Sequence, residues 1–252
     1  MGTIIAATVP AVFAAAVALD PARPLLTYYD DGTGERTELS GATLANWAAK
    51  TANQLADGHG LGPGDTAALR LPPHWQTAGV LLGCWAAGLC VDTGLGGEGL
   101  RGSNAGPFAA AYVTAEGLAG APPADATFAL GLHPLGAPMN PPPPPGVLDY
   151  VVDVRQHGDH FAPVIPVGPE DPAEHGLSHE DLLAQAREWA TDRGLDPNER
   201  ILFDADSFPD PLAWLVAPLV VGATVVLCRR LDPARLDSRV AAERVTHAVL
   251  PA

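Results

Sequence analysis

The chain has 252 residues, 47% of them hydrophobic, and a mean hydropathy of +0.12, which is enough apolar material for one large domain or two smaller ones. Its formal net charge of −15, with Lys50 the single lysine among fourteen basic residues, disfavours nucleic acid and anionic membranes as partners. The three cysteines form no C-x-x-C pair, so the sequence predicts neither a disulfide framework nor a zinc site and fits a reducing cytoplasm.

The N-terminal stretch TIIAATVPAVFAAAVAL (residues 3–19) is apolar enough to raise the question of a signal peptide or a membrane anchor. It carries no positive charge, contains Pro10, and is too short to span a bilayer. We therefore expect a buried first helix that begins near Pro10.

The next segment has the pattern of a hairpin followed by a helix. The β-rich stretch LLTYYD (25–30) is separated from ERTEL (35–39) by the turn residues DGTG. Ser40 has the position and chemistry of an N-cap, and apolar residues then recur at helical spacing. The sequence thus predicts a hairpin and an amphipathic helix over residues 41–57.

A βαβ unit is predicted further along the chain. It consists of a strand at 66–71, an almost wholly apolar helix at 75–88 and a strand at 89–93, followed by a third strand at 109–115. Residues 93–106 and 119–146 have the composition of loops.

Five consecutive prolines (141–145) predict a stiff polyproline spacer or a docking segment for an aromatic groove. We therefore divide the chain into a first α/β lobe (1–140), a connector (141–146) and a second α/β lobe (147–252). The second lobe is predicted to alternate strands and helices, with strands at 147–154, 201–206, 224–229 and 247–252, and helices at 181–194, 211–222 and 234–245. The fold class is α/β, with layered parallel-sheet units.

Three stretches, in this order, resemble the adenylate-forming superfamily of acyl-CoA synthetases, luciferases and peptide-synthetase adenylation domains. They are residues 26–92, GLSHEDLL (176–183) and residues 199–252, the last of which contains APL, GAT and RVTH in the family's order. The chain is similar to short actinobacterial homologues. The resemblance implies the front half of the family's N-terminal domain without its small C-terminal domain, and the family's adenine-binding, ribose-binding and catalytic-lysine segments are not among the 252 residues.

One departure from the family concerns the phosphate-binding loop. The family places a Ser/Thr/Gly-rich loop with a lysine before the second stretch, because backbone amides and a cation must meet the ATP phosphates. Residues 169–176 contain three carboxylates and two prolines instead. What remains of the region as candidate cofactor contacts is Gly176, Ser178 and His179. A position that often holds histidine near the family's acyl pocket falls near Phe208 or Pro209.

Several other motifs are better interpreted as structural than as functional. The G-x-G-x-x-G pattern at 94–99 is not followed by a helix-forming segment, and GLSHE lacks the second glycine of a nucleophile elbow, so Ser178 is interpreted as an N-cap. The histidines at 157, 160, 175 and 179 and Asp159 are interpreted as unliganded loop residues. We expect no metal site and no catalytic residue.

We therefore expect a non-catalytic homologue that binds a protein partner, a second copy of itself or a small acyl-like ligand, without a cofactor. Two alternatives stay open. One is an AMP-forming acid ligase that uses ATP and Mg²⁺ and completes its site with a second chain. The other is a structural homo-oligomer formed through the open edge of HAVLPA (247–252).

Overall fold

The computed structural model describes residues 6–95 and 107–251, which form two compact units. The first contains the described residues within 1–45, 72–78 and 180–252, and the second those within 46–71 and 79–179. The expected connector at 141–146 lies inside the second unit. The strands on either side of it, β6 (Ala124–Leu130) and β7 (Leu148–Asp149), pair in parallel. The segments before and after the prolines therefore belong to one sheet.

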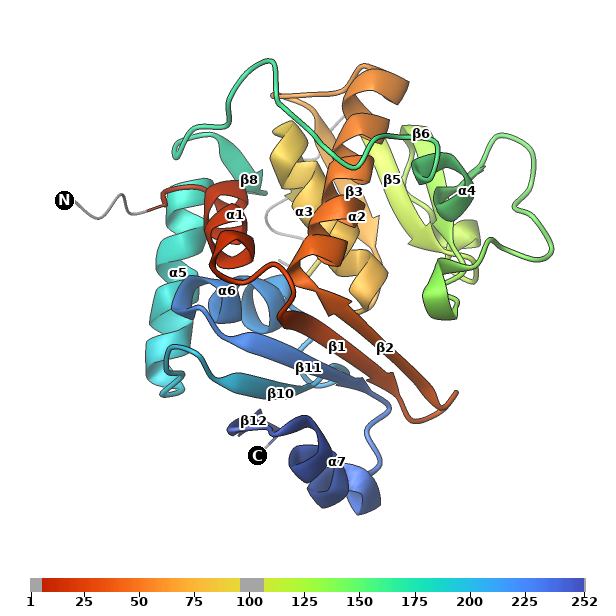
Figure 1. Ribbon diagram of the computed structural model, residues 1–252. Helices are drawn as coiled ribbons and strands as arrows, with labels where there is room; N and C mark the ends of the chain where they lie inside the picture. Colours follow the sequence, from red (N-terminus) through yellow and green to blue (C-terminus); the bar gives the residue numbers. More distant parts are fainter. Residues whose placement is uncertain (1–5, 96–106, 252) are drawn as a thin grey trace. The chain divides into compact units, whose positions relative to one another are not determined.

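The first unit is built on a five-stranded sheet with the order β12-β10-β11-β1-β2 (Figure 1). Its strands are β1 (Pro24–Asp30), β2 (Glu35–Ser40), β10 (Arg200–Asp204), β11 (Thr224–Arg229) and β12 (His247–Val249). The hairpin of β1 and β2 confirms the prediction, and β1, β10, β11 and β12 run parallel to one another. HAVLPA contributes an edge strand, as expected.

Helices cover both faces of this sheet. They are α1 (Val9–Leu19), α5 (His179–Asp192), α6 (Ala217–Val221), which follows a π-helical turn at Leu212–Val216, and α7 (Leu236–Glu243). Alternate strand residues point to opposite faces. Leu202 and Val226 therefore pack towards Leu236 and Val240 of α7, while α1 and α6 lie on the other face (Figure 1).

The first helix begins where it was predicted, but it is buried only along one face, at Val9, Val12 and Phe13. Thr8 caps it by accepting a hydrogen bond from the Ala11 amide at 3.3 Å, and Pro10 occupies the first turn, where its missing N–H costs nothing. Among residues 6–95 and 107–251, no helix is long and apolar enough to cross a membrane.

The second unit contains a seven-stranded sheet with the order β7-β6-β5-β3-β4-β8-β9. Its other strands are β3 (Thr66–Arg70), β4 (Cys90–Asp92), β5 (Phe108–Thr114), β8 (Pro172–Glu174) and β9 (Leu177–Ser178). Strands β3 and β4 are parallel and joined by α3 (Trp75–Ala87), which confirms the βαβ prediction.

The predicted helix α2 (Gly41–Asn53) begins after Ser40, whose hydroxyl accepts a hydrogen bond from the Thr43 amide at 3.1 Å. Within the second unit, α2 and α3 approach closely at Gly83. A β carbon at this glycine would lie 2.4 Å from the Thr51 β carbon, so the contact requires glycine.

Two sequence predictions are wrong in this unit. The stretch 119–146 is not all loop, because Ala124–Leu130 forms β6 beside β5. The stretch 147–154 is not a strand beyond Asp149, because the Asp149 carboxylate accepts hydrogen bonds from the Val151 and Val152 amides at 2.9 and 3.2 Å and starts α4 (Tyr150–Val154). A local cap outweighs the β preference of the valines.

Candidate functional site

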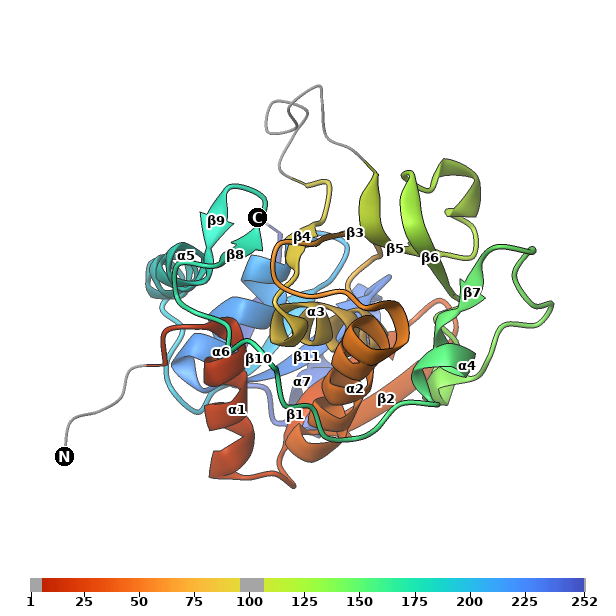
Figure 2. The same cartoon turned by 90° about the horizontal axis from the view of Figure 1, so that it is seen from above.

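The segment expected to replace the phosphate loop is a short hairpin. Strands β8 and β9 pair antiparallel beside β4, and only His175 and Gly176 separate them (Figure 2). Gly176 has a φ of +81°, a left-handed conformation that suits the second residue of such a tight turn. Within residues 169–176, the first three residues form a turn, the next three form β8, and His175 and Gly176 form the two-residue turn.

The backbone amides around this hairpin donate to the protein itself. Gly168 N donates to Asp171 Oδ2 at 2.7 Å, and Asp171 N donates to the Gly168 carbonyl at 3.3 Å. His175 N donates to the Val91 carbonyl at 3.1 Å, and His179 N to the Asp171 carbonyl at 3.0 Å. Because prolines at 169 and 172 have no N–H, the segment offers few amides to an external anion.

The hairpin is anchored from the second unit's core. The indole N–H of Trp85 on α3 donates to the Ala173 carbonyl at 2.8 Å, and both residues are buried. The Thr93 hydroxyl donates to Glu174 Oε1 at 3.2 Å, beside the register pair Val91 and Glu174. These bonds fix β8 against the sheet.

The three candidate residues differ in exposure. Gly176 is exposed at the turn, Ser178 is half-buried at the end of β9, and His179 is fully buried as the first residue of α5. Burial lowers the pKa of His179 to about 4, and the nearby Asp171 opposes this only in part. The imidazole is therefore neutral at neutral pH and supplies no positive charge for a phosphate.

The single lysine is committed to a structural contact. Lys50 Nζ on α2 donates to the His157 carbonyl at 2.7 Å and forms an ion pair with Asp159 at 2.5 Å. The Asn53 amide donates to the carbonyls of Gly158 and His160, both at 2.9 Å. Two residues of α2 thus hold the loop that contains the candidate histidines His157 and His160.

No metal site is found among residues 6–95 and 107–251, where no three His, Cys, Asp or Glu side chains are grouped to hold an ion. The glycine pattern at 94–99 lies largely outside the described residues.

Sequence reasoning missed a charged cluster at the carboxyl ends of the first unit's parallel strands, where ligands of open α/β sheets usually bind. Arg230, which follows β11, pairs with the Asp30 carboxylate at the end of β1, and its own amide donates to Asp206 Oδ2 at 2.7 Å. The Ser207 hydroxyl donates to Asp204 Oδ2 at 2.6 Å. These acidic groups are occupied by protein donors.

His74 is buried in the same unit and packs edge-on against Tyr28 at 4.4 Å between ring centroids. Burial, reinforced by Arg229, lowers its pKa to about 3. Its Nδ1 accepts from the Gln76 amide at 3.1 Å, so the proton of the neutral ring lies on Nε2.

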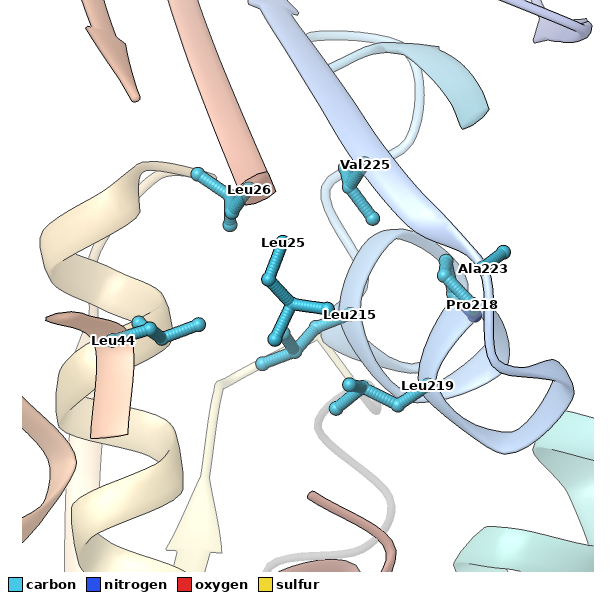
Figure 3. A pocket seen from close by; sticks show the side chains of 8 residues that line it. All are labelled: Leu25, Leu26, Leu44, Leu215, Pro218, Leu219, Ala223 and Val225. Atoms are coloured by element: carbon cyan, nitrogen blue, oxygen red, sulfur yellow. The ribbon is translucent and has the colours of Figure 1, made fainter. Parts of the chain in front are cut away.

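An apolar pocket lies in the first unit between β1, β11 and α6 (Figure 3). Its volume is about 10 Å³, and its lining is entirely aliphatic: Leu25, Leu26, Leu44, Leu215, Pro218, Leu219, Ala223 and Val225. Room for a single water-sized probe does not accommodate an acyl chain.

The described part of the chain has the fold of the N-terminal domain of adenylate-forming enzymes. An acyl-CoA synthetase from Brucella canis superposes with a TM-score of 0.70 at 17% identity, over 94% of this chain and 46% of that chain. The N-terminal domain of FACL13 from Mycobacterium tuberculosis gives 0.68 at 13% identity, over 96% and 62%. A fatty acyl-adenylate ligase from L. pneumophila, solved with acyl adenylate and pyrophosphate, gives 0.64 at 13% identity, over 96% and 44%.

The chain thus spans 44–62% of the length of these solved proteins, and the low identities establish the fold alone. No family model matches the sequence. A "TIGR03089 family protein" of Mycobacterium tuberculosis is 42% identical over 231 residues, which cover 90% of this chain and 91% of the relative. The chain belongs to the TIGR03089 family.

Proposed function

We propose that the protein is a non-catalytic binding protein that uses the adenylate-forming scaffold without adenylating a substrate. The observation that carries the proposal is the two-residue turn of the β8–β9 hairpin at the place where the resemblance leads us to expect a phosphate-binding loop.

Electrostatics at this hairpin argues against a triphosphate. Glu170, Asp171 and Glu174 place three formal negative charges on the segment, and His179 is buried and neutral. Two like charges about 4 Å apart repel by about 1 kcal/mol in water and about 4 kcal/mol at an effective dielectric of 20. A cation at the same place would be needed to make the interaction of this segment with a phosphate attractive.

Donor supply supports the same conclusion. Phosphate loops bind anions through several unoccupied amides, whereas the amides of Gly168, Asp171, His175 and His179 already bond to protein oxygens. Lys50, the single lysine, is held by Asp159 and the His157 carbonyl. An anion that used these four amides would have to displace the protein oxygens that they now bind.

The direct test is isothermal titration of the intact protein with ATP and Mg²⁺, with an acyl-CoA synthetase as the positive control. We expect no saturable binding up to about 1 mM ATP, which corresponds to about −4 kcal/mol. Micromolar binding that is lost when Glu174 or Ser178 is replaced by alanine would refute the proposal.

A second candidate function is an AMP-forming acid ligase whose site is completed by another chain. It is favoured by β12, an edge strand of the first unit's sheet, because an unpaired strand edge can accept a strand from a partner. Pyrophosphate exchange is measured with the protein alone and with partners captured from its native host. Exchange that needs both components would establish the ligase, and light scattering of the protein alone would reveal self-assembly through the same edge.

A further inference from the structure

A groove of about 360 Å³ lies at the amino-terminal edge of the first unit's sheet. Strands β1, β10, β11 and β12 are parallel, and all of them begin at this edge. The residues that matter most in its lining are Arg23, Asn198, Arg200, Glu243, Arg244 and Thr246. The groove is thus on the opposite edge from the charged cluster at Asp30 and Arg230.

The charges of this arginine groove, as we name it, are not balanced. Arg200 donates through Nε to the Glu243 carbonyl at 2.7 Å and pairs with the Glu243 carboxylate at 2.5 Å. That carboxylate also accepts from Arg36 at 2.9 Å, so it is fully used. Arg23 donates through one terminal nitrogen to the Gly222 carbonyl at 3.4 Å, and within the described ranges neither Arg23 nor Arg244 pairs with a carboxylate. Both positive charges thus lack a counter-ion, in a chain whose net charge is −15.

Two backbone amides in the lining of the groove already donate to protein carbonyls, which leaves recognition mainly to side chains. Thr224 N donates to the Glu199 carbonyl at 2.8 Å, and Thr246 N donates to the Arg200 carbonyl at 2.9 Å. Arg200 is committed to Glu243 and to the Thr27 hydroxyl, so the side-chain donors in the lining that remain for a ligand belong to Arg23, Arg244 and Asn198. Guanidinium forks bind phosphate and carboxylate oxygens through paired hydrogen bonds.

Arg244 occupies a position that stability alone would give to glycine. It caps the C-terminus of α7 with a φ of +54°, the left-handed conformation in which glycine is the common residue. Strained positions of this kind cluster at binding sites. The groove thus carries a long cationic side chain at a position where glycine would remove the strain.

We propose that the arginine groove binds the phosphate group of a small phosphorylated molecule. A phosphate monoester carries about 1.5 to 2 negative charges at neutral pH, which matches the two arginines that have no carboxylate partner. A groove of about 360 Å³ is within the range of small-molecule sites. The arginines attract the phosphate over roughly 10 Å, against the repulsion of the acidic chain as a whole, so binding weakens with salt.

The test titrates the intact protein with inorganic phosphate and with glycerol 3-phosphate, and uses succinate to represent dicarboxylates. We expect one saturable site per chain for both phosphates, with affinity falling at least about tenfold in Arg23→Ala and Arg244→Gly. Arg187→Ala removes an exposed arginine of α5 in the same unit and is expected to change affinity less than about twofold.

Arg244→Gly also guards against a folding artefact. It relieves the left-handed strain, so its thermal midpoint is expected to rise while phosphate binding falls. Absence of saturable phosphate binding, equal binding by Arg244→Gly, or equal weakening by Arg187→Ala would overturn the proposal. Tighter binding of succinate than of either phosphate would overturn the assignment of the ligand class.

Discussion

Replacing Trp85 by phenylalanine tests how firmly the β8–β9 hairpin is built into the second unit. The indole N–H of Trp85 supplies a 2.8 Å hydrogen bond to the Ala173 carbonyl, and Trp85 is only 2% exposed. Phenylalanine keeps an aromatic ring but leaves that buried carbonyl without this donor.

The expected loss follows from two contributions. An unsatisfied buried acceptor costs about 1–3 kcal/mol. The smaller ring leaves a gap of a few heavy atoms, which at about 24 cal/mol per Å³ of cavity adds roughly 1 kcal/mol. The free energy of unfolding should therefore fall by about 2–4 kcal/mol, a large part of the about 5–15 kcal/mol of a typical domain.

Urea unfolding measures this loss, and amide hydrogen exchange locates it. In Trp85→Phe the His175 amide, which bonds to the Val91 carbonyl, should exchange faster than in the parent. Trp189→Phe makes the same chemical change on α5, where the ring stacks on Phe203 and beneath Arg193, and should cost less than about 1 kcal/mol. A loss below about 0.5 kcal/mol in Trp85→Phe, or equal losses in both variants, would refute the reasoning.

Three further predictions concern packing, pH and the lysine contact. Gly83→Ala places a β carbon 2.4 Å from the Thr51 β carbon and should lower the free energy of unfolding by about 1–3 kcal/mol. Gly79→Ala, whose added β carbon has its nearest contact at 3.2 Å, should lower it less. Equal urea midpoints for the two variants would contradict this prediction. Burial lowers the pKa of His179 to about 4, below its value of about 6.5 in the unfolded chain. As the pH drops, the unfolded chain therefore takes up the proton first. The free energy of unfolding should fall by up to about 3 kcal/mol between pH 6.5 and pH 4. His179→Gln should flatten this slope but not abolish it, because buried His74 titrates in the same direction; an unchanged slope would count against the assignment. Lys50→Ala should speed proteolysis at residues 157–160 and cost about 1 kcal/mol, and unaltered cleavage would show that the loop is held by other contacts.

Much of the fold could be predicted from local sequence signals. The Ser40 cap, the DGTG turn and the apolar run of α3 each act over a few neighbouring residues, so the hairpin, α2 and the βαβ unit were recognisable. The strand-helix alternation after residue 200 follows from the same periodicity. These signals are local because caps, turns and helical faces are made by residues close in the chain.

Predictions failed where a single side chain or a distant strand decided the outcome. The β-branched run after Asp149 becomes α4 because one carboxylate caps two amides. The stretch at Ala124–Leu130 becomes β6 because β5 offers a partner strand. The pairing of β6 cannot be predicted from composition, since it depends on the strand that lies beside it, whereas the Asp149 cap is a local signal that was overlooked.

The sequence by itself determined the α/β class, the resemblance to the adenylate-forming superfamily and the acidic, lysine-free composition of residues 169–176, because these depend on residue type and order. Tertiary structure decided that residues 172–178 form a hairpin with a two-residue turn whose first strand is held by Trp85, and that Arg23, Arg200 and Arg244 share one groove. Those arginines are separated by as many as 221 positions in the chain. Only the parallel pairing of strands, which aligns their amino ends at one edge, brings them together.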